Sequence, residues 1–232
     1  MDKEYEDKKN KDFKKQELID YWRRYNIIRD ESLLEAFKKT RRENFVLDEY
    51  KDHAYIDAPL PILNGQTISQ PTTIMIMLQA LELKPDDCVL EIGAGSGYVA
   101  AIMSHLCKKI YAAEIIPQLV EFAKQNLKNE GIKNVIVLQD DGKLNYKNYS
   151  PFDKIIVSCA CPKIPDILIK QLKENGLLVI PVGPINVQEM FVIRKGLKKE
   201  TKNTHSKSVD QELSIKSLGE FIFVPLQGNY GY

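Results

Sequence analysis

From residue 88 onward the chain alternates short apolar runs with amphipathic segments, and this alternation constrains the fold more than any other feature. Segments that begin near Tyr98, Pro117 and Pro165 have helical spacing, and Gly131 and Gly176 suit the C-terminal caps of helices. The pattern predicts an α/β fold with a doubly wound, mainly parallel, seven-stranded Rossmann-like sheet. The expected strands are CVLEI (88–92), KIYAAE (109–114), VIVLQ (135–139), DKIIVSC (153–159), LLVIPV (177–182), EMFVI (189–193) and FIFVPL (221–226).

The last two expected strands lack a convincing helix between them. Residues 196–216 are rich in Lys, Thr and Ser and have no apolar stripe. We therefore expect an antiparallel C-terminal edge whose strands are joined by an exposed loop.

The N-terminal third has a different pattern. Residues 1–16 mix Lys with Asp and Glu and carry little apolar content, which predicts a charged, flexible lead-in. Two helices are expected between residues 17 and 39, with Asp30 or Ser32 capping the second, and a third helix after Pro71. Residues 45–71 show neither helical nor strand periodicity, so we expect a loop there, and an ordered loop of this length is usually functional. We expect one domain over 17–232, with N-terminal helices and a substrate loop (17–84) before a cofactor-binding sheet and C-terminal strands (85–232).

Charge and composition exclude several classes of protein. The 33 Lys and Arg residues against 32 Asp and Glu leave a net charge of +1, so no nucleic-acid partner is expected. No export segment is visible, and no apolar run reaches the roughly 18 residues of a membrane span. The four cysteines and three histidines lack the spacing of metal ligands. We expect a cytoplasmic monomer with reduced thiols, no membrane contact and no metal.

A glycine-rich turn follows the first expected strand of the sheet. In EIGAGSGY, Glu91 precedes Gly93, Gly95 and Gly97, and glycine lets backbone approach a ligand closely. A dinucleotide fingerprint would need its third glycine at position 98, where the chain has Tyr98. A carboxylate directly before the loop suits a cationic or hydroxyl-bearing ligand better than a pyrophosphate.

Carboxylates also end the next two expected strands. Glu114 lies 21 residues after Gly93, where a carboxylate can accept both ribose hydroxyls of a nucleoside. Asp140 and Asp141 end the third strand, within reach of an adenine amino group. Each acid could instead simply end a strand and begin a turn, but three such positions beside a glycine loop favour a nucleoside site.

These motifs together resemble the class I S-adenosylmethionine-dependent methyltransferases. A narrower resemblance comes from GQTISQP (65–71), IIVSCACPKIP (155–165), LLVIPVG (177–183) and the terminal FVPLQGNYGY, which are similar to segments of protein-L-isoaspartate O-methyltransferases. It extends from about residue 17 to the C-terminus. It implies S-adenosyl-L-methionine as cofactor, S-adenosyl-L-homocysteine as product, and isoaspartyl peptides and damaged proteins as substrates.

The resemblance also implies roles for individual residues. Ser69 corresponds to the active-site serine, in a loop that covers both cofactor and substrate. The implied cofactor contacts are Gln66, Thr67, Ile68, Ser69, Glu91, Gly93, Ala94, Gly95, Gly97, Glu114, Ile115, Asp140, Asp141, Gly142 and Gln227, and the implied substrate contacts are Ile68, Ser69, Ser158, Cys159, Ala160 and Val224. The chain departs from the family at three places. Asp140 replaces a glycine, SCACP replaces a run such as TAGAP, and LNY stands where the family has a glycine after the DG turn.

The implied reaction is methyl esterification of a free carboxylate on L-isoaspartyl, and also D-aspartyl, residues. A carboxylate with a pKa near about 4 is already ionised at neutral pH, so no general base is required. The ester would then cyclise to a succinimide and partly reopen as aspartate, which makes the reaction a repair.

Other interpretations stay open at this stage. Ser69 could be a turn hydroxyl that caps the helix after Pro71. The acceptor could be a small molecule or a tRNA base, although the chain has no NPPY motif. A non-catalytic nucleoside-binding module is the third alternative.

Overall fold

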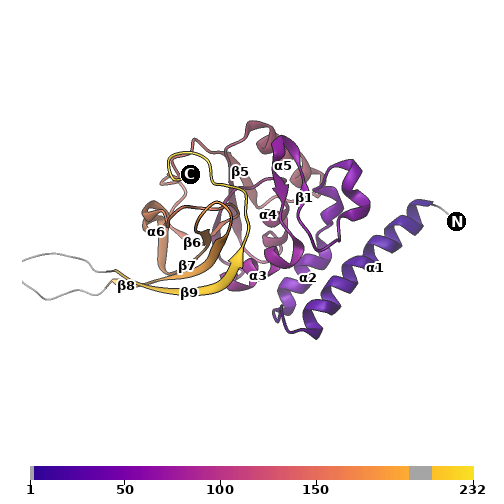
Figure 1. The fold of residues 1–232 in the computed structure, drawn as a ribbon, viewed down its shortest axis with the longest axis horizontal. Helices are drawn as coiled ribbons and strands as arrows, with labels where there is room; N and C mark the ends of the chain where they lie inside the picture. The colour runs from indigo at the N-terminus through magenta and orange to yellow at the C-terminus, as the bar shows by residue number, and fades with distance from the viewer. Residues whose placement is uncertain (1–2, 199–210) are drawn as a thin grey trace, which may run out of the picture.

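The computed structural model describes residues 3–198 and 211–232, and these form a helical region beside one large sheet (Figure 1). Seven strands run in the spatial order β5-β4-β3-β6-β7-β8-β9. The first five in that order pair in parallel, and β7, β8 and β9 pair antiparallel. The strands are β3 (Cys88–Ile92), β4 (Lys109–Glu114), β5 (Val135–Gln139), β6 (Phe152–Val157), β7 (Leu172–Val182), β8 (Gln188–Lys198) and β9 (Gln211–Phe221). This arrangement confirms the expected doubly wound, mainly parallel sheet with an antiparallel edge.

The strand order reverses at β3, which is the first strand of the sheet in the sequence. Along the chain, β4 and β5 are added on one side of β3, and β6 and β7 on the other. Glu91 of β3 lies in register with Ala112 of β4 and Ile156 of β6. In open sheets of this kind, ligands bind in the crevice outside the carboxyl ends of the strands at such a switch point. The fold therefore directs attention to the residues that follow β3, β4 and β6.

Apolar side chains cover both faces of the sheet. One face packs against α3 (Pro71–Leu81), α4 (Tyr98–Met103) and α5 (Pro117–Asn129), with the N-terminal helices behind them. The other face packs against α6 (Asp166–Gln171), the segment between β5 and β6, and part of the C-terminal tail. Among the described residues, no helix combines the length and apolar character needed to cross a membrane.

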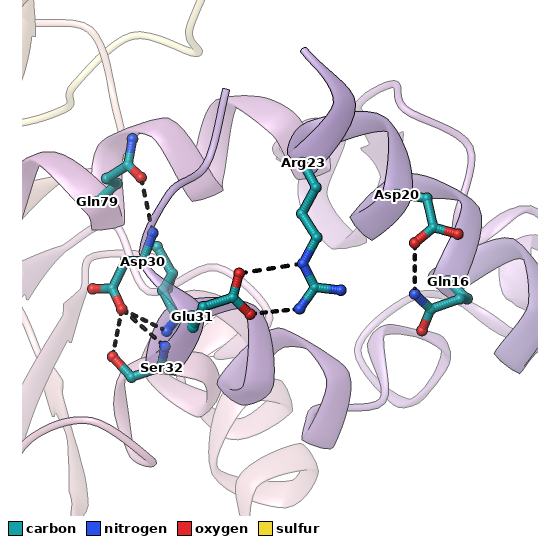
Figure 2. Close-up of polar contacts among 8 residues, drawn as sticks. Gln16, Asp20, Arg23, Asp30, Glu31, Ser32 and Gln79 are labelled. Atoms are coloured by element: carbon teal, nitrogen blue, oxygen red, sulfur yellow. Dashed lines mark hydrogen bonds and ion pairs between the residues drawn. The ribbon is translucent and has the colours of Figure 1, made fainter. Parts of the chain in front are cut away.

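Two helices open the chain, as expected, and they pack on α3. The first, α1 (Lys3–Arg24), is followed by α2 (Glu31–Lys39), whose N-terminus is capped by the Asp30 side chain. The Gln79 side chain on α3 accepts hydrogen bonds from the backbone N–H groups of Arg29 and Asp30. Figure 2 shows the bond from Asp30. Asp30 therefore ends the turn between α1 and α2 and also fixes that turn against α3.

The structure differs from the flexible lead-in expected for residues 1–16. Helix α1 begins at Lys3, so most of that segment is helical. Lys15 is only 5% exposed, and its Nζ donates to the carbonyl oxygens of Lys38 and Thr40 at 2.9 and 3.1 Å. A cation at the C-terminus of α2 stabilises the unpaired carbonyl groups there. A charge count along the sequence gave no sign that one of these lysines is buried.

The long loop before α3 is ordered by short turns and by one small hairpin. It contains three 3-10 turns, η1 (Arg42–Asn44), η2 (Asp48–His53) and η3 (Leu63–Gly65). Strands β1 (Leu60–Pro61) and β2 (Thr67–Ile68) pair antiparallel within it. The hairpin carries the GQTIS segment to the carboxyl edge of the sheet.

Two details near the C-terminus differ from the sequence expectation. Gly176 lies inside β7, where a Cβ would come within 2.9 Å of the Asp153 carbonyl oxygen, so close strand packing rather than a helix cap requires glycine. The last strand spans Gln211–Phe221, so the expected strand at 221–226 is wrong in all but its first residue. β8 and β9 extend into the segment expected to be a loop, and the connection at 199–210 lies outside the described residues.

Candidate active site

A cavity lies at the carboxyl ends of β3, β4 and β6, at the switch point of the sheet. It brings together segments from four separate parts of the chain: the GQTIS hairpin, the glycine loop, the ends of β4 to β6, and the tail after β9. Its lining residues are Gln66, Thr67, Ile92, Gly93, Gly95, Ala113, Glu114, Ile115, Ile116, Leu119, Asp140, Ser158, Cys159, Val224, Pro225, Leu226 and Gln227. Eleven of these were expected from the sequence as cofactor or substrate contacts.

The glycine loop is held close to β4 by backbone hydrogen bonds. The N–H groups of Gly93 and Ala94 both donate to the Ala113 carbonyl oxygen, at 2.9 and 3.0 Å. Gly97 is the N-cap of α4 with φ +85°, and a Cβ there would lie 3.2 Å from Leu127 on α5. Ala94 and Gly97 do not line the cavity; they set the course of the loop while Gly93 and Gly95 face the cavity.

Glu114 organises the cavity as well as lining it. One carboxylate oxygen accepts from the Gly95 N–H at 2.8 Å, and the other accepts from the N–H groups of Ile115 and Ile116 at 2.9 and 3.0 Å. The carboxylate therefore bonds both to the glycine loop and to the residues that lead into α5. A carboxylate has about four lone-pair sites, so three backbone donors leave acceptor capacity for a ligand hydroxyl.

Glu91 is a fully buried carboxyl group without a partner among the described residues. Its side chain is 0% exposed, and neither carboxyl oxygen accepts a hydrogen bond. Burial, and then the nearby charge of Glu114, raise the pKa of Glu91 well above its usual range. Glu91 does not line the cavity, but it directly precedes Ile92 and Gly93, which do. A cationic group bound beside it would relieve the cost of ionising this carboxyl group.

The two aspartates after β5 have different surroundings. Asp140 lines the cavity, and its side chain accepts from the Gly142 N–H at 3.1 Å. The Asp141 side chain is 62% exposed, and it pairs with Lys143 at 2.7 Å, which lowers the pKa of Asp141. The structure thus brings Asp140 into the cavity and leaves Asp141 in a surface ion pair.

The turn at Gly142 is covered by the C-terminal tail at very close range. The Asn229 N–H donates to the Gly142 carbonyl oxygen at 3.0 Å. A Cβ on Gly228, whose φ is +92°, would lie 2.5 Å from the Gly142 Cα. Only two glycines allow this backbone contact, which brings the tail to the cavity that Gln227 and Asp140 both line.

Replacing Gly228 with alanine should displace the tail from the cavity. We expect the free energy of unfolding to fall by about 1–3 kcal/mol because two backbone segments must separate. The matched control is Gly219→Ala: Gly219 also has a positive φ, of +102°, but nothing lies within 4 Å of its Cβ position. Thermal unfolding of both variants measures the difference. Equal losses would mean that backbone strain alone, and not the Gly142 contact, accounts for the effect.

Residues 158–160 are joined to the tail by a short bridge. The Ala160 N–H donates to the Val224 carbonyl oxygen at 2.8 Å, and the Leu226 N–H donates to the Ala160 carbonyl oxygen at 2.8 Å. Ala160 is fully buried and supports this bridge without lining the cavity. Ser158 and Cys159 do line it, and the Ser158 hydroxyl has no partner within the described chain.

A second cavity adjoins the first and contains Ser69. Thr67, Val224 and Pro225 line both cavities, so the two cavities meet at these residues. The second cavity is more apolar. Its lining residues are Pro59, Thr67, Ser69, Gln70, Thr72, Thr73, Ile76, Glu220, Phe221, Ile222, Phe223, Val224 and Pro225. Ile68, expected in both sites, lines neither cavity and is buried in the core.

Ser69 does not cap the helix that begins at Pro71. The N-cap residue is Gln70, whose side chain makes no capping bond. The Asp57 carboxylate takes that role: it accepts from the Thr72 N–H at 2.9 Å and from the Thr72 hydroxyl at 2.6 Å. This removes the turn-hydroxyl alternative for Ser69 and leaves its side chain at the second cavity.

Several residues of the site were not expected from the sequence. Pro225 and Leu226 were assigned to a strand, whereas the structure places them in the cavity wall. Asp57 and the buried Arg42, whose guanidinium donates to the Ser69 carbonyl oxygen, support the GQTIS segment from a distance in sequence. The only signal for these two was that they lie in or beside the long, ordered, proline-rich loop.

Comparisons with known proteins agree with this geometry. Residues 13–231 match the family model described as Protein-L-isoaspartate(D-aspartate) O-methyltransferase (PCMT). The chain is 43% identical to a Protein-L-isoaspartate O-methyltransferase of Pyrococcus horikoshii, over 93% of this chain and 97% of that protein. It is 44% identical to the protein of the same name from Fervidobacterium nodosum, over 84% of this chain and all of that protein.

Solved structures give the same result. One is described as a protein-L-isoaspartate O-methyltransferase, and it is 27% identical with a TM-score of 0.79, over 94% of this chain and 67% of that one. Another is the Plasmodium falciparum protein assigned to the same activity, in complex with S-adenosyl-L-homocysteine. It is 26% identical with a TM-score of 0.75, over 92% of this chain and 98% of that one.

Proposed function

The chain belongs to the protein-L-isoaspartate(D-aspartate) O-methyltransferase family, and we propose that its two adjoining cavities divide the work of that reaction. The enzyme transfers a methyl group from S-adenosyl-L-methionine to the free carboxylate of L-isoaspartyl residues in damaged proteins. The methyl ester then leads through a succinimide to aspartate, which repairs the backbone. The observation that carries the division is that the cavity at the glycine loop and the cavity at Ser69 adjoin and share the lining residues Thr67, Val224 and Pro225.

We propose that the cavity at the glycine loop holds the cofactor. The three carboxyl groups suit an adenosyl sulfonium. Glu114 has free acceptor capacity for ribose hydroxyls, and Asp140 can accept from an adenine amino group. The Glu91 carboxyl group, which has no partner among the described residues, lies directly before the loop. When bound, S-adenosylmethionine supplies an electrophilic methyl group on a positively charged sulfur. Apolar Ile92, Ala113 and Leu119 in the lining exclude water from that group.

We propose that the second cavity receives the isoaspartyl polypeptide. Its apolar lining, with Ile76, Phe221 and Phe223, suits the side chains beside the damaged residue. The Ser69 hydroxyl is free to donate a hydrogen bond to the substrate carboxylate and orient it toward the cofactor cavity. Because the carboxylate is ionised at neutral pH, the protein needs to position it and to exclude water, and needs no general base.

The assignment of Ser69 predicts a selective loss of turnover in Ser69→Leu. We expect kcat for an isoaspartyl peptide to fall by about tenfold to a hundredfold, because the bulky side chain displaces the carboxylate from its line of approach. The dissociation constant for S-adenosylhomocysteine should change little, since Ser69 lies at the second cavity. The measurement is transfer of a radiolabelled methyl group into a base-labile ester.

The same assay tests the proposed function as a whole. The matched substrate is a peptide of identical sequence with an ordinary aspartyl residue, which should not be esterified. If the wild-type protein forms no base-labile ester on the isoaspartyl peptide, the acceptor proposed here is wrong. Full turnover by Ser69→Leu would remove only the role of Ser69.

Three further proposals concern the substrate range, the cellular location and the oligomeric state. We propose that D-aspartyl residues are accepted as well, that the protein works in the cytoplasm, and that it is a monomer. Free thiols at all four cysteines support a reducing compartment. A D-aspartyl peptide in the methylation assay tests whether D-aspartyl residues are accepted, and sedimentation tests whether the protein is a monomer.

A further inference from the structure

Arg42 is a buried cation that reaches the segment carrying Ser69 from a distant part of the chain. It belongs to the turn η1, and it is 0% exposed. Its Nη2 donates to the Ser69 carbonyl oxygen at 2.9 Å. Nε and Nη1 have no hydrogen-bond partner in the described structure, so the bond to Ser69 is the directional contact of this guanidinium.

The same guanidinium also contacts the beginning of the helix that follows the glycine loop. Its central carbon lies 5.0 Å from the centre of the Tyr98 ring, a distance at which a cation is attracted to the face of an aromatic ring. Tyr98 is the first residue of α4 and directly follows Gly97, the N-cap. Arg42 thus joins the segment at the second cavity to the helix that begins at the cofactor loop.

A fully buried guanidinium is costly unless its contacts repay the loss of hydration. Arginine stays protonated in proteins, and burial acts against that charge by lowering the pKa of Arg42. A methionine of similar length would fill the space without this cost. The charge of Arg42 is therefore better explained by how it positions the Ser69 carbonyl group and the Tyr98 ring than by a gain in stability alone.

The other side of the Ser69 segment is held independently. Asp57 bonds to the N–H and the hydroxyl of Thr72, and the Trp22 indole N–H donates to the same hydroxyl at 2.7 Å. Residues after Ser69 are therefore fixed to α1 and to the long loop. On the side of the cavities, the contact that holds the Ser69 peptide group is the one from Arg42.

We propose that Arg42 is a positioning residue for methyl transfer, whose guanidinium fixes the Ser69 peptide group relative to Tyr98 and so aligns the substrate site with the cofactor site. This inference rests on the proposed role of Ser69. Arg42 touches neither cavity, so it acts through Ser69 and not on the substrate.

The test is a double-mutant cycle between Arg42→Met and Ser69→Ala, with kcat, KM for an isoaspartyl peptide, and the dissociation constant for S-adenosylhomocysteine as readouts. Arg42→Met alone should lower kcat by about tenfold or more, while the dissociation constant changes by less than about threefold. In the Ser69→Ala background, the same change should cost less than about threefold, because the Ser69 peptide group is still held but no longer carries the hydroxyl that orients the substrate. Arg42→Lys keeps a cationic donor and should recover part of kcat.

Two controls keep the result decisive. Arg23→Met removes an arginine of the same region that forms an exposed ion pair with Glu31, and it should leave all three parameters unchanged (Figure 2). If Arg42→Met does not fold, the cycle is measured with Arg42→Lys. Equal losses in both backgrounds, unchanged kcat, or a parallel loss of cofactor affinity would each overturn the positioning role. Wild-type kcat in Ser69→Ala alone would instead refute the proposed role of Ser69, and with it the premise of this inference.

Discussion

Replacing Glu114 with alanine should raise the dissociation constant for S-adenosylhomocysteine by about a hundredfold or more. Hydrogen bonds to a charged acceptor contribute about 1.5–3 kcal/mol each, and the change removes the carboxylate that we propose as the acceptor for ribose hydroxyls. It also leaves the N–H groups of Gly95, Ile115 and Ile116 without their partner, so the glycine loop loses its bond to the end of β4. Isothermal titration calorimetry measures the affinity, and thermal unfolding measures the accompanying loss of stability.

Two further variants separate the causes. Glu114→Gln keeps the size of the side chain but presents an amide N–H toward one set of donors, so it should lose much of the affinity as well. Glu121→Gln is the matched control, because Glu121 lies on α5 in an exposed ion pair with Lys124. Affinity within about threefold of wild type in Glu114→Ala would exclude this carboxylate as the ribose acceptor.

The second large effect is a gain in stability in Glu91→Gln that comes with a loss of cofactor affinity. Glu91 has a raised pKa because it is buried and because Glu114 is close. Near neutral pH the unfolded chain carries this group ionised, while the folded chain without ligand must keep it protonated or bear a buried charge. The glutamine has nearly the same shape and no such cost. We expect the free energy of unfolding to rise by about 1–4 kcal/mol near pH 8.

The pH dependence gives the sign of this effect. Below the usual pKa of about 4.5, both folded and unfolded states hold the proton, so Glu91 contributes nothing. As the pH rises above that value, only the unfolded state releases its proton, and the wild-type protein loses stability until the folded group ionises. The difference in Tm between Glu91→Gln and wild type should thus be near zero at about pH 4 and grow toward pH 8. A difference independent of pH would contradict a protonated Glu91 in the folded protein.

Cofactor affinity should fall in the same Glu91→Gln variant that gains stability. A carboxylate beside the loop favours positive charge, so Glu91→Gln should weaken S-adenosylmethionine, which has a sulfonium, more than S-adenosylhomocysteine, which does not. Calorimetry with both ligands at the same pH gives the ratio. Equal losses for the two ligands would mean that Glu91 does not respond to the sulfonium charge.

Much of the central sheet could be predicted because its signals are local. The strands β3, β4 and β5 begin and end at the expected residues, since each is a short run rich in apolar and β-branched side chains. These side chains are mostly buried in β3 and β4 and partly buried in the edge strand β5. The helix starts at Pro71 and Pro117 were also predicted, because proline at the first helical position sacrifices no hydrogen bond. The ends of β8 and β9 were not, because antiparallel pairing between them stabilises segments that have little apolar content.

By itself the sequence determined that the glycines and carboxylates directly following three neighbouring parallel strands meet at one edge of the sheet, where we propose that the cofactor binds. The tertiary structure alone decided which of these groups face the cavity. It placed Asp140 in the lining and paired Asp141 with Lys143, and it left the Glu91 carboxyl group without a partner among the residues that the structure describes. It also brought Arg42 to Ser69, a contact between residues 27 apart. Such contacts depend on how loops pack across the whole domain, and spacing along the chain carries no signal for them.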